Sequence, residues 1–162
     1  MSAFPAKILV ATDGSEDAAL AVQAAVDLSN ETGAGLHVVH VGESLPVYPP
    51  PAAGPPPSSP SSTEIQRIAR GLLDTQIELI GEMGGKVEEA HLRTGRPAEE
   101  ILRLSEDIVA GLIVVGNQGL SGRFSRMRRF VMGSVSENVT RYARCSVMVV
   151  RKDLYDRPSA DQ

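Results

Sequence analysis

Short apolar runs rich in β-branched residues alternate along this chain with longer stretches that have helical periodicity. The apolar runs comprise residues 8–11, 36–41, 87–92, 112–115 and 147–150. Buried strands separated by helix-length segments are typical of a parallel sheet joined by crossover helices. The pattern therefore predicts an α/β fold with five strands in one sheet.

The character of each apolar run indicates where its strand lies. Residues 8–11 and 112–115 are uniformly apolar, as expected for central strands. Residues 87–92 mix polar with apolar positions, which places that strand at an edge with one face in water. The last run, 147–150, is apolar, so an edge position there offers a surface for pairing with a second copy.

Local start and stop signals place a helix in each of the four connections. The expected starts are Ser15, Ser61, Pro97 and Ser134. Ser61 with Glu64, and Ser134 with Glu137, have the spacing of capping boxes, and proline suits the first helical position. Glycines at 33 and 84–85 are expected to end the first two helices.

One segment before the second helix fits no regular element. Residues 46–62 are dominated by proline, which excludes a helix interior or a central strand. Such a loop is either a lid over a ligand or a disordered excursion, and its low-complexity composition favours disorder. We expect a single domain over residues 1–162 with this loop and a flexible tail at 153–162.

Charge, apolar content and cysteine content exclude several classes of protein. The chain has 162 residues and a formal net charge of −4, which disfavours nonspecific binding to nucleic acid or to an anionic membrane. No apolar run approaches the ~18 residues of a membrane helix, and the first residues do not form a signal peptide, so a cytoplasmic protein is expected. The single cysteine, Cys145, excludes an intramolecular disulfide, and no grouping of cysteine with histidine indicates zinc.

The three histidines are interpreted as structural. His37 and His40 are three positions apart on one predicted strand, so their side chains lie on opposite faces and cannot bind the same metal ion. His91 lies on the predicted edge strand.

A glycine turn after the fourth strand carries the candidate chemistry. The turn and the helix start that follows it comprise Val115, Gly116, Gly119, Gly133, Ser134 and Val135. Glycine lets backbone N–H groups approach an anion, and the first turn of a helix adds unpaired donors and a partial positive charge. The order of strand, glycine turn and helix start predicts a phosphate-binding site and hence a nucleotide.

The end of the first strand supplies a second part of this site. In a doubly wound sheet the ligand lies beyond the carboxyl ends of the strands, which would bring Ala11, Thr12 and Asp13 beside the glycine turn. There Asp13 can accept hydrogen bonds from ribose hydroxyls or help to hold a divalent cation. The alternative is that Asp13 only caps the turn before the first helix.

These motifs, together with residues 94–101, resemble the universal stress protein family over nearly the whole chain. Only the proline-rich loop and the tail after Lys152 fall outside the resemblance. It implies an open sheet in the strand order 3-2-1-4-5 with helices on both faces, which is the adenine nucleotide alpha hydrolase-like fold. It also implies a homodimer through the last strand. One branch of the family binds ATP, and the other lacks nucleotide binding.

The ATP-binding branch is marked by two glycines three positions apart, nine further residues, and a third glycine followed by Ser or Thr. This pattern falls on Gly116, Gly119, Gly133 and Ser134, but here thirteen residues separate the last two glycines, four more than in the family motif. A register that uses Gly119 and Gly122 leaves ten residues and loses the glycine directly after the strand. We prefer the first register with an insertion.

The resemblance also implies roles for individual residues, with ATP and Mg²⁺ as the expected cofactors. Asp13 takes the position of the family's acidic nucleotide contact, next to Ala11 and Thr12, and Val41 takes that of the apolar contact to adenine. The residues that would wrap the phosphates are Val115, Gly116, Gly119, Gly133, Ser134 and Val135.

The insertion within the glycine motif is basic. Residues 122–130 hold four arginines and two phenylalanines. This segment is a clasp for phosphates, an ordinary solvated loop, or a docking site for RNA or an acidic protein.

Two functional hypotheses remain open from the sequence. No Walker motif and no evident general base accompany the glycine turn, so binding is favoured over catalysis, and slow ATP hydrolysis stays open. The first hypothesis is an ATP-dependent switch in a stress response that acts on an unidentified protein partner. The second is a nucleotide-free module that works through its dimer surface.

Overall fold

The computed structural model describes residues 4–42, 61–118 and 133–152. The elements in chain order are β1 (Lys7–Ala11), α1 (Glu16–Thr32), β2 (Gly35–Gly42), α2 (Ser62–Glu82), β3 (Val87–Thr94), α3 (Pro97–Asp107), β4 (Leu112–Gly116), α4 (Ser134–Tyr142) and β5 (Ser146–Val150). The predicted strands and helices are therefore all present, and each strand is one to two residues longer than its apolar run.

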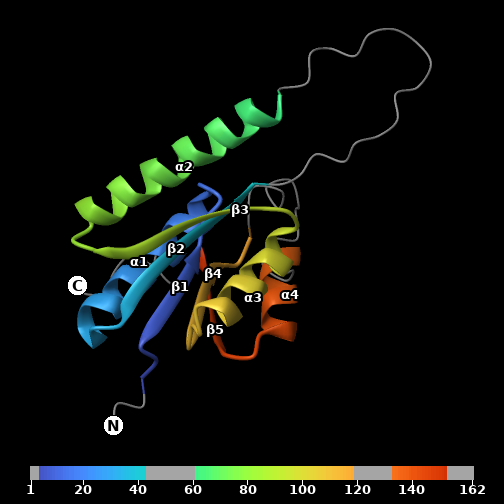
Figure 1. The fold of residues 1–162 in the computed structure, drawn as a ribbon. Coiled ribbons are helices and arrows are strands. Elements are labelled where there is room, and N and C mark those ends of the chain that lie inside the picture. Colours follow the sequence, from blue (N-terminus) through green and yellow to red (C-terminus); the bar gives the residue numbers. More distant parts are fainter. Residues whose placement is uncertain (1–3, 43–60, 119–132, 153–162) are drawn as a thin grey trace, which may run out of the picture.

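The five strands form one parallel sheet in the order β3-β2-β1-β4-β5 (Figure 1). The α/β fold class and the strand order are confirmed. The uniformly apolar strands β1 and β4 lie inside the sheet, while β3 and β5 form its two edges. The reversal of winding between β1 and β4 opens a crevice beyond their carboxyl ends.

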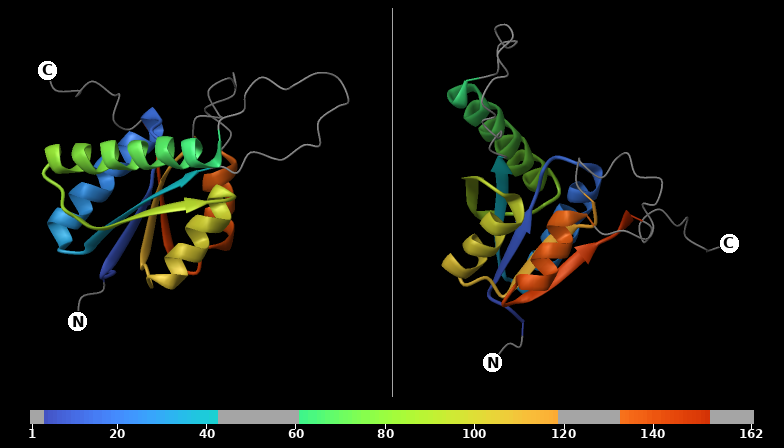
Figure 2. Two further views of the ribbon diagram at one scale, coloured as in Figure 1. Left: turned by 45° about the horizontal axis from the view of Figure 1, so that its top comes forward. Right: turned by 90° about the vertical axis from the view of Figure 1, so that its right-hand side faces the viewer.

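Helices cover both faces of the sheet, with α1 and α2 on one side and α3 and α4 on the other (Figure 2). Each face has its own buried cluster. Val10 packs with Val22 of α1 and Leu73 of α2, whereas the adjacent Leu9 packs with Ile101 of α3. Successive side chains of a strand point to opposite faces, so one apolar strand supplies both layers of core.

The helix signals were accurate at most positions. Ser15 and Ser61 are the N-caps of α1 and α2. Each serine hydroxyl accepts a hydrogen bond at 3.2 Å from the backbone N–H three residues later, that of Ala18 or Glu64. Gly33 ends α1 in the left-handed conformation, with φ of 77°. Because Ser61 caps α2 and Ser62 begins it, the predicted loop over 46–62 is too long at its end, and the rest of that loop lies outside the described residues.

The capping box predicted at Ser134 is wrong. Gly133 is the N-cap of α4, in extended conformation, and no side chain caps the helix there. The Gly133 N–H donates instead to the Asn117 carbonyl at 2.8 Å, which places Ser134 inside the first turn. The N-cap of α4 is thus set by the hydrogen bond to Asn117, which follows β4, and not by the local spacing of Ser134 and Glu137.

Candidate functional site

A cavity of about 820 Å³ opens at the carboxyl ends of β1, β2 and β4, where the winding of the sheet reverses. Every predicted site residue that the structure describes lines it: Ala11, Thr12, Asp13, Val41, Val115, Gly116, Gly133, Ser134 and Val135. Gly119 lies outside the described residues, as does the arginine-rich segment 122–130. The cavity falls within the size range of small-molecule sites.

The turn after β1 gives Asp13 a structural contact within the cavity wall. Asp13 Oδ1 accepts a hydrogen bond from the Ser15 N–H at 2.9 Å, and the buried Thr12 hydroxyl lies 3.3 Å from the Gly14 nitrogen. Asp13 therefore caps the turn and also lines the cavity. The two readings of this carboxylate are compatible, because a carboxylate has several acceptor positions.

The strand end of β4 and the start of α4 are tied together despite the lengthened motif between them. The Asn117 carbonyl accepts from the Gly133 N–H at 2.8 Å and from the Ser136 hydroxyl at 3.0 Å. Gln118 N–H donates to the Asp17 carboxylate at 3.0 Å. The end of β4 and the start of α4 thus meet at one wall of the cavity, while Gly119 and Gly122, which would distinguish the two registers, lie outside the described residues.

The glycine at the end of β4 serves packing as well as clearance. A Cβ at Gly116 would lie 2.7 Å and 2.8 Å from the backbone C and O of Asp17, in the first turn of α1. A Cβ at Gly133 would lie 3.0 Å from the Asn117 carbonyl oxygen. Gly116 therefore allows α1 to approach the strand end, which is a role that the phosphate argument did not include.

Part of the cavity is suited to an aromatic ring. Its apolar lining includes Val39 and Val41 from β2, Leu72 from α2, and Ile101 from α3. The lining also includes the first turn of α4, where N–H groups have no partner within the helix. The cavity thus has one wall for an apolar group and another that favours an anion.

The sequence analysis did not assign several other lining residues to the site, among them His40, Asn117, Leu72 and Pro97. His40 is buried, with Nδ1 2.8 Å from the Thr12 carbonyl oxygen. Asn117 has a buried side-chain oxygen without a hydrogen-bond partner among the described residues. Leu72 and Pro97 reach the cavity from helices. Asn117 could have been predicted as a site residue, because it lies inside the glycine turn. Leu72 could not, because it reaches the cavity only through the packing of α2.

A second polar cluster lies between β2 and β3. His37 and His40 point to opposite faces, as predicted, but His37 meets His91 of the edge strand, with 3.1 Å between Nδ1 and Nε2. Among the residues that the structure describes, His37, Glu89 and His91 form a group whose candidate ligand atoms all lie within 4.8 Å of one another. Burial lowers the pKa of His91, and the nearby His37 and Arg93 lower it further. The Glu89 carboxylate acts in the opposite direction and raises it, but by less than burial lowers it. His91 is therefore neutral at pH 7.

A parallel sheet in this strand order, with a cavity at the switch point, defines an α/β protein of the doubly wound class. The model of the universal stress protein family matches residues 6–151. The chain belongs to the universal stress protein family.

Known relatives agree with this assignment. The chain is 34% identical over 150 residues to universal stress protein YxiE of Bacillus subtilis, covering 90% of this chain and 98% of that protein. A universal stress family structure from Burkholderia pseudomallei is 27% identical with a TM-score of 0.63, covering 90% and 95% of the two chains. The Archaeoglobus fulgidus universal stress protein in complex with dAMP is 23% identical with a TM-score of 0.62, covering 89% and 96%.

Within residues 4–42, 61–118 and 133–152, no helix has both the length and the apolar character needed to cross a bilayer.

Proposed function

We propose that this protein binds an adenine nucleotide, with ATP and Mg²⁺ as the physiological form, and acts as a nucleotide-dependent switch in a stress response. The observation that carries the proposal is the cavity itself. It brings Asp13, the apolar wall around Val41, and the first turn of α4 to one place, although they lie far apart in the sequence. These three parts suit ribose or a cation, adenine, and phosphate, respectively.

Related proteins with this fold support an adenine nucleotide as the ligand. Universal stress protein structures have been solved in complex with cAMP, with dAMP and, for an Arabidopsis thaliana protein, with AMP. The ligands share the adenine ring and a phosphate, which are the two groups that the apolar lining and the first turn of α4 suit. Asp13 is the residue that would hold Mg²⁺, which would offset the phosphate charge.

The ionisable groups of the site favour binding over turnover. Among the described lining residues, the ionisable side chains are those of Asp13 and His40. Asp13 Oδ1 is bonded to the Ser15 N–H, and His40 Nδ1 is held at the Thr12 carbonyl. The lining thus offers few candidate bases, and slow hydrolysis at most accompanies binding.

Ser134→Glu tests the phosphate wall directly. A carboxylate in the first turn of α4 interacts favourably with the helix dipole, so the fold should be retained. The same negative charge repels a phosphate bound there. We expect ATP affinity, measured by calorimetry, to fall at least about tenfold. Ser134→Gln has a similar size without the charge and should lose much less.

The outcome distinguishes the two functional hypotheses. If the wild-type protein is purified without nucleotide and does not bind ATP, AMP or cAMP, the proposal fails and the nucleotide-free interaction module takes its place. If ATP binds equally well to wild type and Ser134→Glu, the phosphate lies elsewhere.

We also propose that two copies pair through β5. This strand is an edge of the sheet, and its Met148 is 38% exposed. Exposed apolar side chains on an unpaired edge favour association with a second strand.

Met148→Lys should convert the dimer to a monomer, because a charge at the edge opposes pairing. Sedimentation velocity measures the change, and Met148→Leu serves as the matched apolar control. A wild-type monomer, or a dimer that survives Met148→Lys, would reject this interface.

A further inference from the structure

The pairing of β2 with β3 contains an irregularity that gathers polar groups around His37. Leu36 pairs with Val87, but His37 pairs with Glu89, so Glu88 is an extra residue in β3. A bulge of this kind re-aims the side chains that follow it. It places Glu89 and His91 on the same face of the sheet as His37, while Glu88 also remains near the His37 ring.

The three side chains converge on one small volume. His37 Nδ1 lies 3.1 Å from His91 Nε2, and Glu89 Oε2 lies 4.0 Å and 3.9 Å from these two nitrogens. The ring planes are inclined by 13° and the centroids lie 5.4 Å apart, so the rings meet end to end through this nitrogen pair. A shared ion requires one imidazole to turn so that both lone pairs converge on it. Two imidazole nitrogens and a carboxylate oxygen thus face one another.

We propose that His37, His91 and Glu89 bind one divalent transition metal ion of the zinc class. Imidazole and carboxylate are ligands that zinc accepts in tetrahedral sites. Bonds of about 2.0–2.1 Å at tetrahedral angles place ligand atoms ~3.3 Å apart. The nitrogen pair is already near that separation, and the Glu89 side chain, 63% exposed, has room to close the remaining gap.

The surroundings of His37 support a ligand role. His37 is 2% exposed, and its Nε2 has no hydrogen-bond partner among the described residues, although Glu88 Oε1 lies 3.9 Å away. A metal on Nδ1 would fix the proton on Nε2, and Glu88 would become its acceptor in the outer shell. The buried polar atom would then be satisfied.

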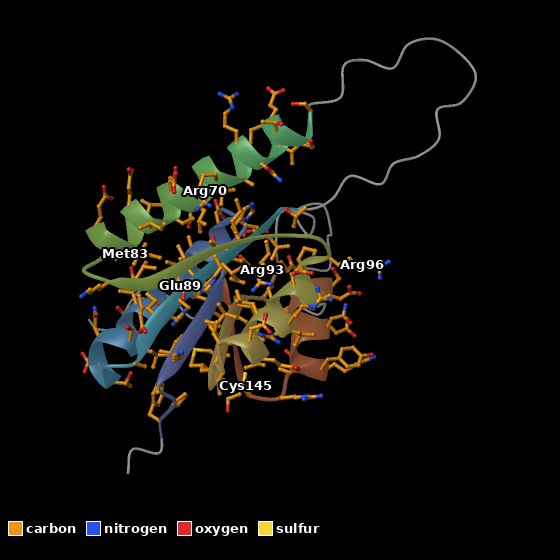
Figure 3. All side chains as sticks on the ribbon, viewed as in Figure 1. Arg70, Met83, Glu89, Arg93, Arg96 and Cys145 are labelled. Carbon is orange, nitrogen blue, oxygen red and sulfur yellow. The ribbon has the colours of Figure 1, made fainter. Side chains whose placement is uncertain are left out.

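The nearest cation on this face of β3 is engaged elsewhere. Arg93 lies beyond Glu89, toward the end of the strand that approaches α3 (Figure 3). Its guanidinium lies 3.4 Å from Asp107 and 3.9 Å from Glu100, both on α3. Those two carboxylates offset its charge, so Arg93 opposes a metal at the histidine pair only weakly.

The metal site is separate from the nucleotide cavity and does not depend on the proposed function. None of His37, Glu89 and His91 lines the cavity, whose lining on β2 begins at Val39, two positions and about 7 Å along the strand from His37. A bound ion would join the edge strand β3 to β2 by coordination, in addition to their backbone hydrogen bonds. It would leave one coordination position for water on the exposed side of the cluster.

The test is a zinc titration of the full chain without an affinity tag and without nucleotide. The sequence has three histidines and one cysteine, so the background is small. We expect one zinc ion per chain by calorimetry and a thermal midpoint that rises by several degrees in excess zinc. His91→Ala should abolish this binding, and the exposed variant Glu89→Gln should weaken it at least about tenfold.

Matched controls separate the site from other zinc ligands. Cys145→Ser removes the only thiol, and Glu78→Gln removes an exposed carboxylate of α2; both should bind zinc like the wild type. The proposal is overturned if the wild type does not bind zinc, or if Glu89→Gln and His91→Ala both bind with wild-type affinity. In either case the histidine pair is a hydrogen bond between two imidazoles and no more.

Discussion

Asp13→Asn should lower the affinity for ATP by about 10- to 100-fold while leaving the stability of the fold nearly unchanged. The expected loss corresponds to a hydrogen bond that involves a charged group, worth about 1.5–3 kcal/mol. The fold is spared because the asparagine oxygen can still accept from the Ser15 N–H, as Asp13 Oδ1 does at 2.9 Å. Calorimetry for binding and thermal unfolding for stability measure the two effects separately.

This substitution discriminates between the two roles of Asp13. Glu16→Gln is the matched control, because Glu16 is an exposed carboxylate at the start of α1 that does not line the cavity. Its ATP affinity should remain near that of the wild type. If Asp13→Asn also binds like the wild type, the carboxylate serves only the turn.

Gly116→Ala should destabilise the protein by about 3 kcal/mol, which is a drop of roughly 6–12 °C in the thermal midpoint. The added Cβ would meet backbone atoms of Asp17 at 2.7 Å and 2.8 Å. Backbone cannot rotate away as a side chain can, so α1 or the end of β4 must move. Since both elements line the cavity, nucleotide binding should weaken as well.

Gly71→Ala provides the control for this prediction. Gly71 lies in α2, and a Cβ there meets no atom within 4 Å. Alanine should therefore stabilise the helix by about 0.5–1 kcal/mol. Equal midpoints for the two variants would show that the packing of α1 against Gly116 has no energetic weight.

Local patterns were sufficient for most of the fold. Strand runs and cap residues such as Ser15 depend on neighbours in the sequence, and these predictions are confirmed. The family resemblance supplied the full strand order, whereas the approach of Asp13 to the glycine turn was already expected from a doubly wound sheet. The cap of α4 was misplaced because Gly133 is held by Asn117, sixteen positions earlier in the chain.

The histidine cluster shows what local patterns miss. The apolar side chains of β3 that face the core are Val87, Ala90 and Leu92. A regular strand would place them two residues apart, so the spacing of three between Val87 and Ala90 marks the bulge. Read as a regular alternation, the strand gives no reason for His91 to approach His37. Their contact depends on the register of two strands, which the sequence of either strand alone does not determine.

The hydrogen bond between Asn117 and Gly133 makes the segment between them a closed loop with fixed ends. The hydrogen bond closes residues 118–132, and the four residues that exceed the family motif cost only about 0.3 kcal/mol in closure entropy. The number of residues between Asn117 and Gly133 therefore has little effect on the stability of the cavity wall that these two residues form. We therefore expect a short reporter peptide inserted between residues 118 and 133 to leave the sheet and the start of α4 intact.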